Sequence, residues 1–307
     1  MKEGSVKGRP SLFPFPDAIY MRCPVSKELA KKIEKVIGRK WFNTRIFHKW
    51  EAWQLLTKHK ELCNHLPDTG KVKNENDIHV FFRRYQDVFL KPVDKYSSIG
   101  IVHATHQTKG KINIAYIRKL YQSYGKSFPS SKTLWKWIHS SLCKSDYIVQ
   151  QGIRTIPWKG WATDIRLNMN KNGCGEWEIT ALFARFTDGG SYIGSGAGTG
   201  VLPLDFFLHA SFRDNPEKVD TIRTSIINLG FAICRALENS GLHMADLSID
   251  LGLDEDGHPW IFEVNPRPSP FSPPVTDESL ARPIEYAYYL ASNQKAANPV
   301  TQEKDTE

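Results

Sequence analysis

Three oxygen-bearing side chains near the carboxyl end have the types and spacing of a magnesium site. Asp250 lies in a run that alternates apolar and polar residues, and Glu263 and Asn265 lie in a second such run after a turn at 254–257. Residues i and i+2 of a strand share a face, so Glu263 and Asn265 project together. If the apolar residues of both strands face one core, Asp250 joins them on the opposite face. Carboxylate and amide oxygens suit Mg²⁺ that is shared with nucleotide phosphates.

An ordinary antiparallel hairpin with a solvated polar face is the alternative for this stretch. The alternation of the return strand groups Trp260, Phe262 and Val264 on the core face and leaves Ile261 beside Glu263. Acidic turns are common between strands, so the hairpin alone does not decide between a metal site and a solvated face.

Two lysines lie in and just after an earlier predicted strand. Lys91 ends an apolar run at 87–93, which Pro92 closes. A lysine at the end of a buried strand is costly unless it meets an anion, although its ammonium group can also extend to solvent. Lys95 follows in 94–101, where small polar residues would let backbone N–H groups approach a phosphate. That stretch has one glycine and no Walker spacing, so it identifies no phosphate loop by itself.

Two arginines follow on neighbouring predicted strands. Residues 161–170 alternate so that Asp164 and Arg166 share one face. Residues 176–186 predict the next strand, where Arg185 shares a face with apolar residues. An arginine on such a face needs an anionic partner, and an internal carboxylate fits as well as a phosphate.

Composition excludes several classes of protein. With 307 residues, 40% of them hydrophobic and 24% charged, the chain is globular and long enough for one large domain or two to three smaller ones. No apolar run approaches the ~20 residues of a membrane span, and the basic start is not a signal peptide. Five scattered cysteines without a C-x-x-C pair predict a reducing, cytoplasmic setting and no zinc knuckle.

The net charge of +8 permits anionic partners such as nucleotides, nucleic acid or acidic peptides. Lysines and arginines are dispersed along the chain and no nucleic-acid recognition motif is present, so nucleic acid is not the partner that we expect.

The elements that must position these side chains follow from periodicity and capping. The patterns predict helices at 25–36, 49–62, 78–85, 131–142, 216–240 and 278–290. They predict strands at 87–93, 147–153, 161–170 and 176–186, short strands within a flap at 102–130, and the hairpin at 247–265.

Within the first two helices, we expect Leu29, Ile33 and Val36 to face inward and Trp50 and Trp53 to belong to the core. The glycine-rich run at 194–200 lacks dinucleotide-binding spacing and is either a plain loop or a backbone nest near a ligand.

Taken together in order, six short segments resemble one known family. They are Leu-Pro-Asp-Thr at 66–69, Phe-Leu-Lys-Pro at 89–92, Val-Gln-Gln-Gly-Ile at 149–153, Asp-Ile-Arg at 164–166, Ile-Asp at 249–250 and Glu-Val-Asn at 263–265. With these segments the chain resembles the YheC/YheD family of endospore coat-associated ATP-grasp proteins, over residues 15–266. The resemblance implies an α+β ATP-grasp fold in which two α+β subdomains clasp ATP.

A domain plan follows from the break in the pattern at 66–69, from the polar carboxyl end and from the resemblance. A short α/β region that resembles a pre-ATP-grasp domain would occupy 1–65, the ATP-grasp domain 66–291 with a mobile lid at about 93–146, and a disordered tail 292–307. Three departures from the family pattern are visible: few glycines at 96–100, no glycine-bearing turn at 266–270, and an amino-terminal region shorter than a full substrate-binding domain.

Roles for individual residues come from the same resemblance. Those expected to bind the ATP cofactor are Lys91 and Lys95 at the phosphates, Gln150, Gln151, Gly152 and Ile153 at the hinge beside the adenine, and Asp164. Those expected to hold one or two Mg²⁺ are Asp250, Glu263 and Asn265. Those expected at the reacting groups are Arg185 at the acyl phosphate, and Arg166 and Arg267 at the substrate carboxylate or the transferring phosphoryl group.

The implied activity is that of an ATP-dependent carboxylate–amine ligase. Mg-ATP would activate a small-molecule or peptide carboxylate as an acyl phosphate, which an amine would then attack, and a closed flap would exclude water. The alternative is a spore-associated scaffold whose nucleotide site is vestigial, which the few glycines at 96–100 favour. We expect no membrane partner, and the sequence leaves the substrates and the oligomeric state open.

Overall fold

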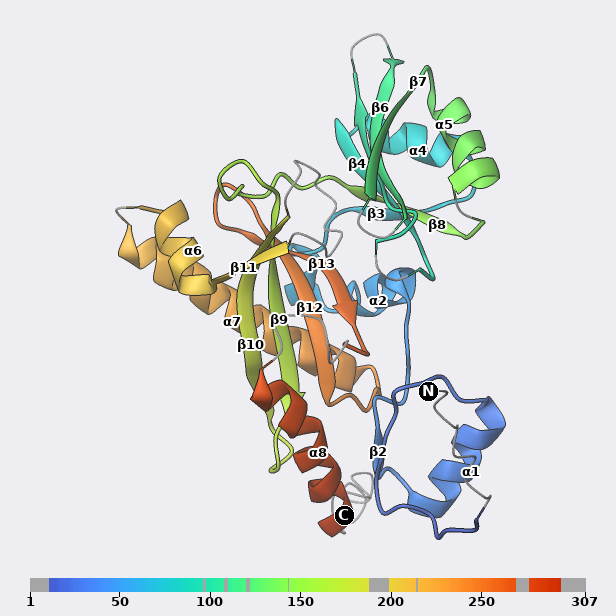
Figure 1. Ribbon diagram of the computed structural model, residues 1–307, viewed down its shortest axis with the longest axis vertical. Coiled ribbons are helices and arrows are strands. Elements are labelled where there is room, and N and C mark those ends of the chain that lie inside the picture. The colour runs from blue at the N-terminus through green and yellow to red at the C-terminus, as the bar shows by residue number, and fades with distance from the viewer. Residues whose placement is uncertain are drawn as a thin grey trace, which may run out of the picture.

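The computed structural model of the chain describes residues 11–95, 98–107, 110–119, 122–142, 144–187, 199–213, 215–268 and 276–293. Within them the predicted α+β class is confirmed: two sheets lie one above the other, and helices cover one face of each (Figure 1). Residues 1–10 and 96–97, most of the glycine-rich run at 194–200, residues 269–270 and most of the predicted tail lie outside the described residues. None of the described helices is long and apolar enough to cross a membrane.

The first sheet has six strands in the order β3-β8-β4-β5-β6-β7. They are β3 (Thr69–Val72), β4 (Asp87–Pro92), β5 (Val102–His106), β6 (Ile112–Lys119), β7 (Gln122–Phe128) and β8 (Tyr147–Gln151). Helices α4 (Glu75–Phe82) and α5 (Ser131–Trp137), which continues into the π-helical turn η2 (Ile138–Leu142), pack on one face. The strict burial alternation of β4 sends Val88 and Leu90 to these helices and leaves Phe89 and Lys91 on the other face.

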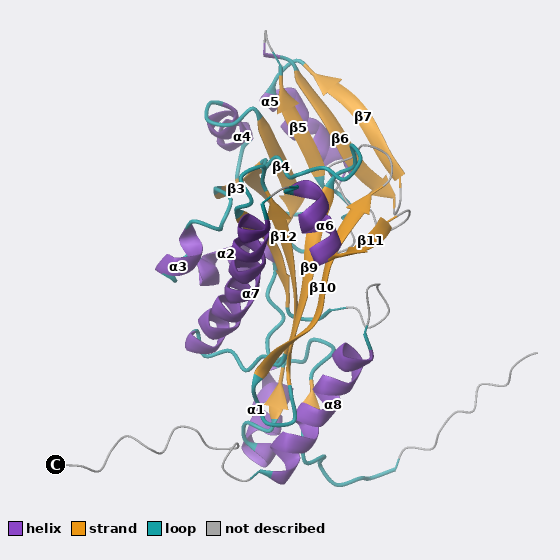
Figure 2. Ribbon diagram, turned by 90° about the vertical axis from the view of Figure 1, so that its left-hand side faces the viewer, coloured by secondary structure: helices purple, strands orange, loops and turns teal. Residues whose placement is uncertain are grey.

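The second sheet has five strands in the order β11-β10-β9-β12-β13. They are β9 (Thr163–Lys171), β10 (Trp177–Thr187), β11 (Thr199–Pro203), β12 (Asp246–Leu253) and β13 (Pro259–Asn265). The long helix α7 (Pro216–Asn239) and the shorter α6 (Leu204–Ser211) cover one face (Figure 2). Ile165, Leu167 and Met169 of β9 are buried against these helices, so the residues between them face the opposite side.

The amino-terminal region forms a small layer at the lower end of the molecule. Strands β1 (Ile19–Tyr20) and β2 (Trp41–Phe42) pair in parallel and flank α1 (Lys27–Ile37), near the carboxyl-terminal helix α8 (Asp277–Ser292) (Figure 1). Ser26 caps the amino terminus of α1, because its side chain accepts a hydrogen bond from the backbone N–H of Leu29 at 3.1 Å.

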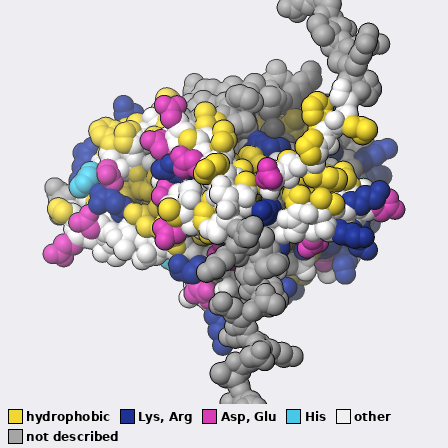
Figure 3. Space-filling view, turned by 90° about the horizontal axis from the view of Figure 1, so that it is seen from below, with side chains coloured by type: hydrophobic (Ala, Val, Ile, Leu, Met, Phe, Trp, Pro, Cys, Tyr) yellow, Lys and Arg dark blue, Asp and Glu magenta, His cyan; other side chains and the backbone are white. Residues whose placement is uncertain are grey.

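The predicted inward face of α1 is wrong for two of its three residues. Ile33 is buried, but Leu29 and Val36 are exposed because α1 touches the rest of the layer along a narrow line. Leu280, Ile284 and Tyr288 of α8 are exposed too, and hydrophobic side chains lie among charged ones on this end of the molecule (Figure 3). Helical periodicity therefore identified the helix here but not how much of its apolar face is covered.

Two further helices lie before the first sheet, α2 (Lys49–Leu56) and α3 (Lys60–Cys63). Ala52, Leu56 and Leu62 belong to the same hydrophobic core as the second sheet and α7. Trp50 and Trp53 were predicted from their spacing to belong to the core, and this prediction is wrong: both are half-buried and stack on each other with ring centroids 5.0 Å apart. They are on the side of α2 that faces the first sheet, since the Lys71 ammonium of β3 lies 5.8 Å from the Trp50 ring centroid.

The division that we placed at residues 65/66 stays a prediction, as does the mobility of 93–146. Hydrophobic contacts cross the first of these boundaries, since the core of the second sheet includes residues from both sides of it. The two sheets themselves have separate hydrophobic cores.

Candidate active site

The hairpin of β12 and β13 brings the three predicted metal ligands onto one face of the second sheet. Asp250 pairs directly with Glu263, and Ser248 pairs with Asn265. Directly opposed residues of antiparallel strands project to the same side of the sheet. The three oxygen-bearing side chains therefore lie together, and their role as metal ligands stays a prediction.

A β-bulge in this hairpin overturns the predicted alternation of β13. The register shifts between Asp250 and Leu251, so Phe262 has no partner on β12. Ile261 is consequently buried in the core, 3% exposed, although strict alternation placed it on the polar face. Trp260 and Phe262, predicted for the core, instead face the polar side with Glu263, and the Phe262 ring lies where a side chain at Gly252 would otherwise be.

Arginines from β9 and β10 bind the carboxylates of this face. The Arg185 guanidinium donates to both oxygens of Asp164, at 2.6 and 2.7 Å, and to Asp250 Oδ1 at 3.0 Å. The Arg166 Nε lies 2.8 Å from Asp250 Oδ1, and its Nη1 donates to Ser248 Oγ at 2.8 Å. The anionic partner that Arg185 required is thus a pair of internal carboxylates.

Burial and charge act against each other in this cluster. Burial raises the pKa of Asp164, and the nearby Arg185 charge opposes that rise. Burial by itself would lower the pKa of Arg185, but Asp250 and Asp164 outweigh it and raise the pKa above its ordinary value. Arg185 is therefore a permanent cation in a largely dry environment.

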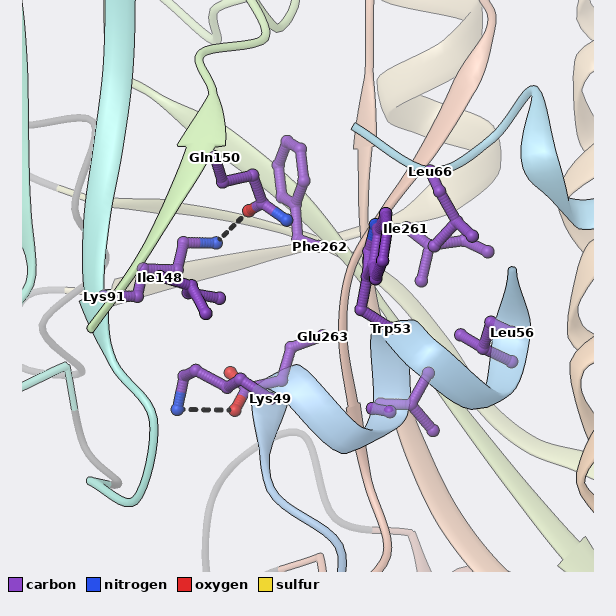
Figure 4. Close-up of a pocket in the computed structure, with 12 residues that line it drawn as sticks. Lys49, Trp53, Leu56, Leu66, Lys91, Ile148, Gln150, Ile261, Phe262 and Glu263 are labelled. Carbon is purple, nitrogen blue, oxygen red and sulfur yellow. Dashed lines mark hydrogen bonds and ion pairs between the residues drawn. The ribbon is translucent and has the colours of Figure 1, made fainter. Parts of the chain in front are cut away.

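Lys91 faces this cluster from the first sheet. Its ammonium group donates to Gln150 Oε1 at 2.6 Å, which fixes the lysine at the end of β4 (Figure 4). The pKa of Lys91 is lowered to about 8, chiefly by burial; Glu263 and Asp250 oppose this shift, and the Lys49 charge adds to it. The lysine of one sheet and the carboxylates of the other are therefore close enough to influence each other's charge.

Lys49, the first residue of α2, is a member of the site that the sequence patterns did not single out. Its ammonium group lies 3.1 Å from Glu263 Oε1 and donates to the backbone carbonyl of Lys95 at 2.7 Å. A lysine in the first turn of a helix opposes the helix dipole. That unfavourable position was the available signal that Lys49 has another role.

A cavity of about 30 Å³ lies between the two sheets and α2. Lys91, Ile148 and Gln150 line it from the first sheet, Phe262 and Glu263 from β13, and Lys49 and Trp53 from α2 (Figure 4). The Lys91 ammonium also lies 5.8 Å from the Phe262 ring centroid. The predicted nucleotide residues Lys91 and Gln150 and the predicted metal ligand Glu263 thus share one cavity.

The charges of the site favour an anion. Its cations are Lys49, Lys91, Arg166 and Arg185, and its carboxylates are Asp164, Asp250 and Glu263. Four positive charges meet three negative ones, and this positive excess favours an anionic ligand such as a polyphosphate.

The residues present fit magnesium that is bound jointly with phosphates. No group of three or more His, Cys, Asp or Glu residues able to hold a metal occurs in the described part of the chain. The candidate set has two opposed carboxylates, Asp250 and Glu263, and the amide of Asn265, which is too few for a closed all-protein site. Mg²⁺ ordinarily takes one or two carboxylates and completes its shell with phosphate oxygens and water.

The predicted hinge residues form the connection that leaves the first sheet. Gln151 exchanges hydrogen bonds with Asp68, and the Gly152 N–H donates to the Asp87 carbonyl at 2.9 Å. A Cβ at Gly152 would lie 2.7 Å from that carbonyl oxygen, so only glycine allows this approach. Ile153 follows and is buried.

The structure places Lys95 and Arg267 less directly at the cavity. The Lys95 carbonyl accepts from Lys49, which puts its backbone beside the site. Arg267 lies two residues beyond Asn265 and donates to the Arg22 carbonyl of the amino-terminal layer at 3.0 Å.

Comparison with known proteins agrees with this arrangement. The YheC/D-like ATP-grasp family matches residues 38–290. The chain belongs to this family. Relatives in Bacillus subtilis strain 168 are the endospore coat-associated proteins YheD, 24% identical over 94% of this chain and 68% of YheD, and YheC, 24% identical over 91% of this chain and 79% of YheC.

Solved structures confirm the ATP-grasp fold. D-alanyl-alanine synthetase A from Vibrio cholerae superposes with a TM-score of 0.52 at 13% identity, covering 86% of this chain and 70% of that protein. The VanG D-Ala:D-Ser ligase from Enterococcus faecalis gives a TM-score of 0.50 at 13% identity, covering 88% of this chain and 68% of that one. The predicted ATP-grasp fold and YheC/YheD membership are thus both correct.

In this YheC/D-like chain, a buried polar cluster ties the amino-terminal layer to the second sheet. The Tyr20 hydroxyl donates to the Asp246 carboxylate, and Asn170 donates to the other carboxylate oxygen at 2.9 Å. Arg22 donates to Tyr20 at 2.6 Å and lies beside Arg267 through the Arg22 carbonyl. Sequence patterns missed this cluster because Tyr20 and Asp246 are 226 residues apart along the chain.

Proposed function

We propose that this chain is a Mg-ATP-dependent ligase that joins a carboxylate to an amine. The observation that carries the proposal is the meeting of Lys91 from the first sheet with Glu263 of the second across one cavity, with Asp250 close enough to raise the pKa of the lysine. Bound ATP supplies the phosphoryl group that activates the carboxylate, and Mg²⁺ neutralises phosphate charge.

The lysines would hold the phosphates. Lys91 and Lys49 line the cavity, and the Lys95 backbone lies beside Lys49. Asp250, Glu263 and Asn265 would hold Mg²⁺. The two carboxylates are paired with Arg166, Arg185 and Lys49, so binding of Mg-ATP would exchange these internal partners for the metal and the phosphates.

The arginines would stabilise the charge that develops during transfer. Arg185 is held in place by bidentate contact with Asp164, which leaves little orientational freedom to lose on reaction. Arg166 and Arg267 would face the substrate carboxylate, Arg166 from the centre of the sheet and Arg267 from beside the amino-terminal layer.

The substrate class that we propose is an amino acid or a peptide. The names of the two superposed structures describe ligases that act on D-amino acids, which supports a carboxylate–amine reaction for this chain. The test is incubation with ATP, Mg²⁺ and pooled amino acids, followed by mass spectrometry and by measurement of ADP and phosphate. The expected result is a condensed product with ADP and phosphate release only when an acceptor amine is present, whereas a stable phosphorylated product would indicate a kinase.

A coat-associated scaffold with a vestigial nucleotide site is the second candidate, and the names of the two Bacillus relatives favour it. The internal pairing of every site carboxylate also suits a purely structural cluster. Thermal melting with millimolar Mg-ATP separates the two proposals, because a ligand that binds the native state raises the melting temperature. An unchanged melting temperature would support the scaffold, which would associate with the spore without turning over ATP.

A further inference from the structure

The cavity contains one buried hydrogen-bond donor that the site described above does not use. The indole Nε1 of Trp53 is buried and has no hydrogen-bond partner among the residues that the structure describes. Trp53 lines the cavity from α2, across from Lys91 and Gln150 (Figure 4). A buried N–H without a partner is costly, so its presence in a wall indicates a partner that arrives from outside.

The neighbours of Trp53 hold its ring in place. Trp50 stacks on it with the rings inclined by 15°, and Lys71 of the first sheet lies over Trp50. Leu56, Leu66 and Ile261 lie around the same part of the cavity. The indole is therefore presented by a rigid wall, which is the condition for a selective contact.

The cavity is polarised along its length. Lys49, Lys91 and Glu263 lie on one side, whereas Trp53, Leu56 and Leu66 lie on the other (Figure 4). Phosphates belong with the lysines, so the apolar part is left for the base of a nucleotide. The only nitrogen or oxygen side-chain atom that the apolar residues contribute there is the Trp53 Nε1.

We propose that Trp53 selects the base of the nucleotide, with its indole N–H donating to a ring nitrogen of a purine. This inference rests on the proposed use of ATP, and it assigns the recognition of the nucleobase to Trp53. Gln150 is already engaged at both ends, since its oxygen accepts from Lys91 and its nitrogen donates to Thr69 at 3.0 Å. Trp53 is therefore the donor still available at the base.

The cavity must widen before it can hold a purine base. About 30 Å³ holds a group the size of a water molecule and not a purine. The walls belong to two sheets with separate cores, so they can separate without breaking either core. Base binding would then place the inserted ring beside Phe262, with the Trp53 N–H directed at the edge of that ring.

The test compares nucleotide affinity in Trp53→Phe and in the matched control Trp50→Phe, measured calorimetrically with Mg-ATP. Removing one hydrogen bond while keeping an aromatic ring is expected to weaken binding about three- to tenfold in Trp53→Phe. Trp50→Phe keeps the stack and should bind within about twofold of the original protein. Equal affinity in the two variants would overturn the inference.

A second experiment begins with the unaltered protein, so its first comparison does not depend on the folding of a variant. Deaza analogues of ATP that lack the N1, N3 or N7 acceptor are titrated in turn. One analogue should bind about three- to tenfold more weakly than ATP, and Trp53→Phe should no longer distinguish it from ATP. Identical affinity for all three analogues would contradict a contact with the base, whereas no binding of ATP itself would contradict the proposed function.

Discussion

At the scale of single residues, Lys91 is the side chain in which stability and function oppose each other most directly. Its folded pKa of about 8, lowered mainly by burial, lies below the ordinary value of 10.5. Because the pKa of Lys91 is lower in the folded protein, the unfolded chain binds more protons between pH 8 and 10.5. The free energy of unfolding therefore rises with pH across that window. Below pH 8 the protein retains the cost of a buried ammonium group.

Replacement of Lys91 by methionine removes that cost. We expect Lys91→Met to be more stable than the original protein by roughly 1–2 kcal/mol at pH 7, with the difference shrinking towards pH 10. Urea unfolding at pH 7 and pH 9.5 measures this. A loss of stability at pH 7 would show that the contacts of the ammonium group with Gln150 and the carboxylates outweigh its burial.

The same pKa predicts how nucleotide affinity depends on pH. Phosphates need Lys91 protonated, so Mg-ATP affinity should fall as the pH rises through about 8. In Lys91→Met the affinity should be weaker and independent of pH in this range. Calorimetric titrations at pH 7, 8 and 9 test it, and an unchanged profile in the variant would assign the step to another group.

Glu263 tests the metal assignment. Glu263→Ala should reduce nucleotide turnover on the order of 100-fold or more while the fold stays intact, because the side chain lies on a polar face and contributes little to the core. Glu255→Ala, in the exposed turn of the same hairpin, is the matched control. Turnover that persists in Glu263→Ala with normal magnesium dependence would remove Glu263 from the site.

At the scale of elements, the hinge after β8 (Tyr147–Gln151) is set by one backbone contact. Gly152 lies so close to Asp87 that a Cβ would meet its backbone and side chain at 2.7 Å. Gly152→Ala should therefore destabilise the protein by roughly 1–3 kcal/mol and weaken nucleotide binding by shifting Gln150 and Gln151. Gly173→Ala, whose Cβ would meet Glu285 at an ordinary 3.7 Å, is the control for both measurements.

The bulge in β13 (Pro259–Asn265) shows how one inserted residue alters the chemistry of a strand. It lets Ile261 and Val264 both reach the core while Phe262 and Glu263 both reach the cavity. Regular alternation would have placed only one of Phe262 and Glu263 there. An aromatic wall and a carboxylate are thus adjacent because the strand is irregular.

At the scale of the whole molecule, the Asp246 cluster joins the amino-terminal layer to the sheet that carries the active-site candidates. Burial raises the pKa of Asp246 to about 6, against the contacts with Tyr20, Arg22 and Asn170. A raised acid pKa contributes stability that is complete below the ordinary value of 3.8 and is lost as the pH rises through about 6.

Asp246→Asn should remove this dependence. We expect the difference in unfolding free energy between the original protein and the variant to change by roughly 1–3 kcal/mol between pH 4.5 and pH 7.5, in favour of the variant at the higher pH. Comparing the two proteins isolates Asp246 from His243, whose pKa burial lowers to about 4. A constant difference across this range would mean that Asp246 is ionised throughout.

The sequence by itself determined most of the longer elements and the order of the motifs, whereas β3, β11 and α6 were not predicted. Burial alternation in β4 (Asp87–Pro92) and β9 (Thr163–Lys171), the Ser26 cap and the α7 stripe are local properties, because each depends on neighbouring residues and a fixed repeat. The same local signals placed Asp164 and Arg166 on one face, and Glu263 and Asn265 on another.

Only the tertiary structure decided which of these faces meet. Lys91 comes near Asp250 because the two sheets are stacked, Lys49 reaches Glu263 because α2 packs on the core of the second sheet, and Tyr20 reaches Asp246 from the amino-terminal layer. No periodicity encodes a contact between residues so far apart along the chain. The bulge at Phe262 and the cavity-facing side of Trp53 have the same origin. Each is fixed by packing against a distant element, which overrides the local pattern that the sequence displays.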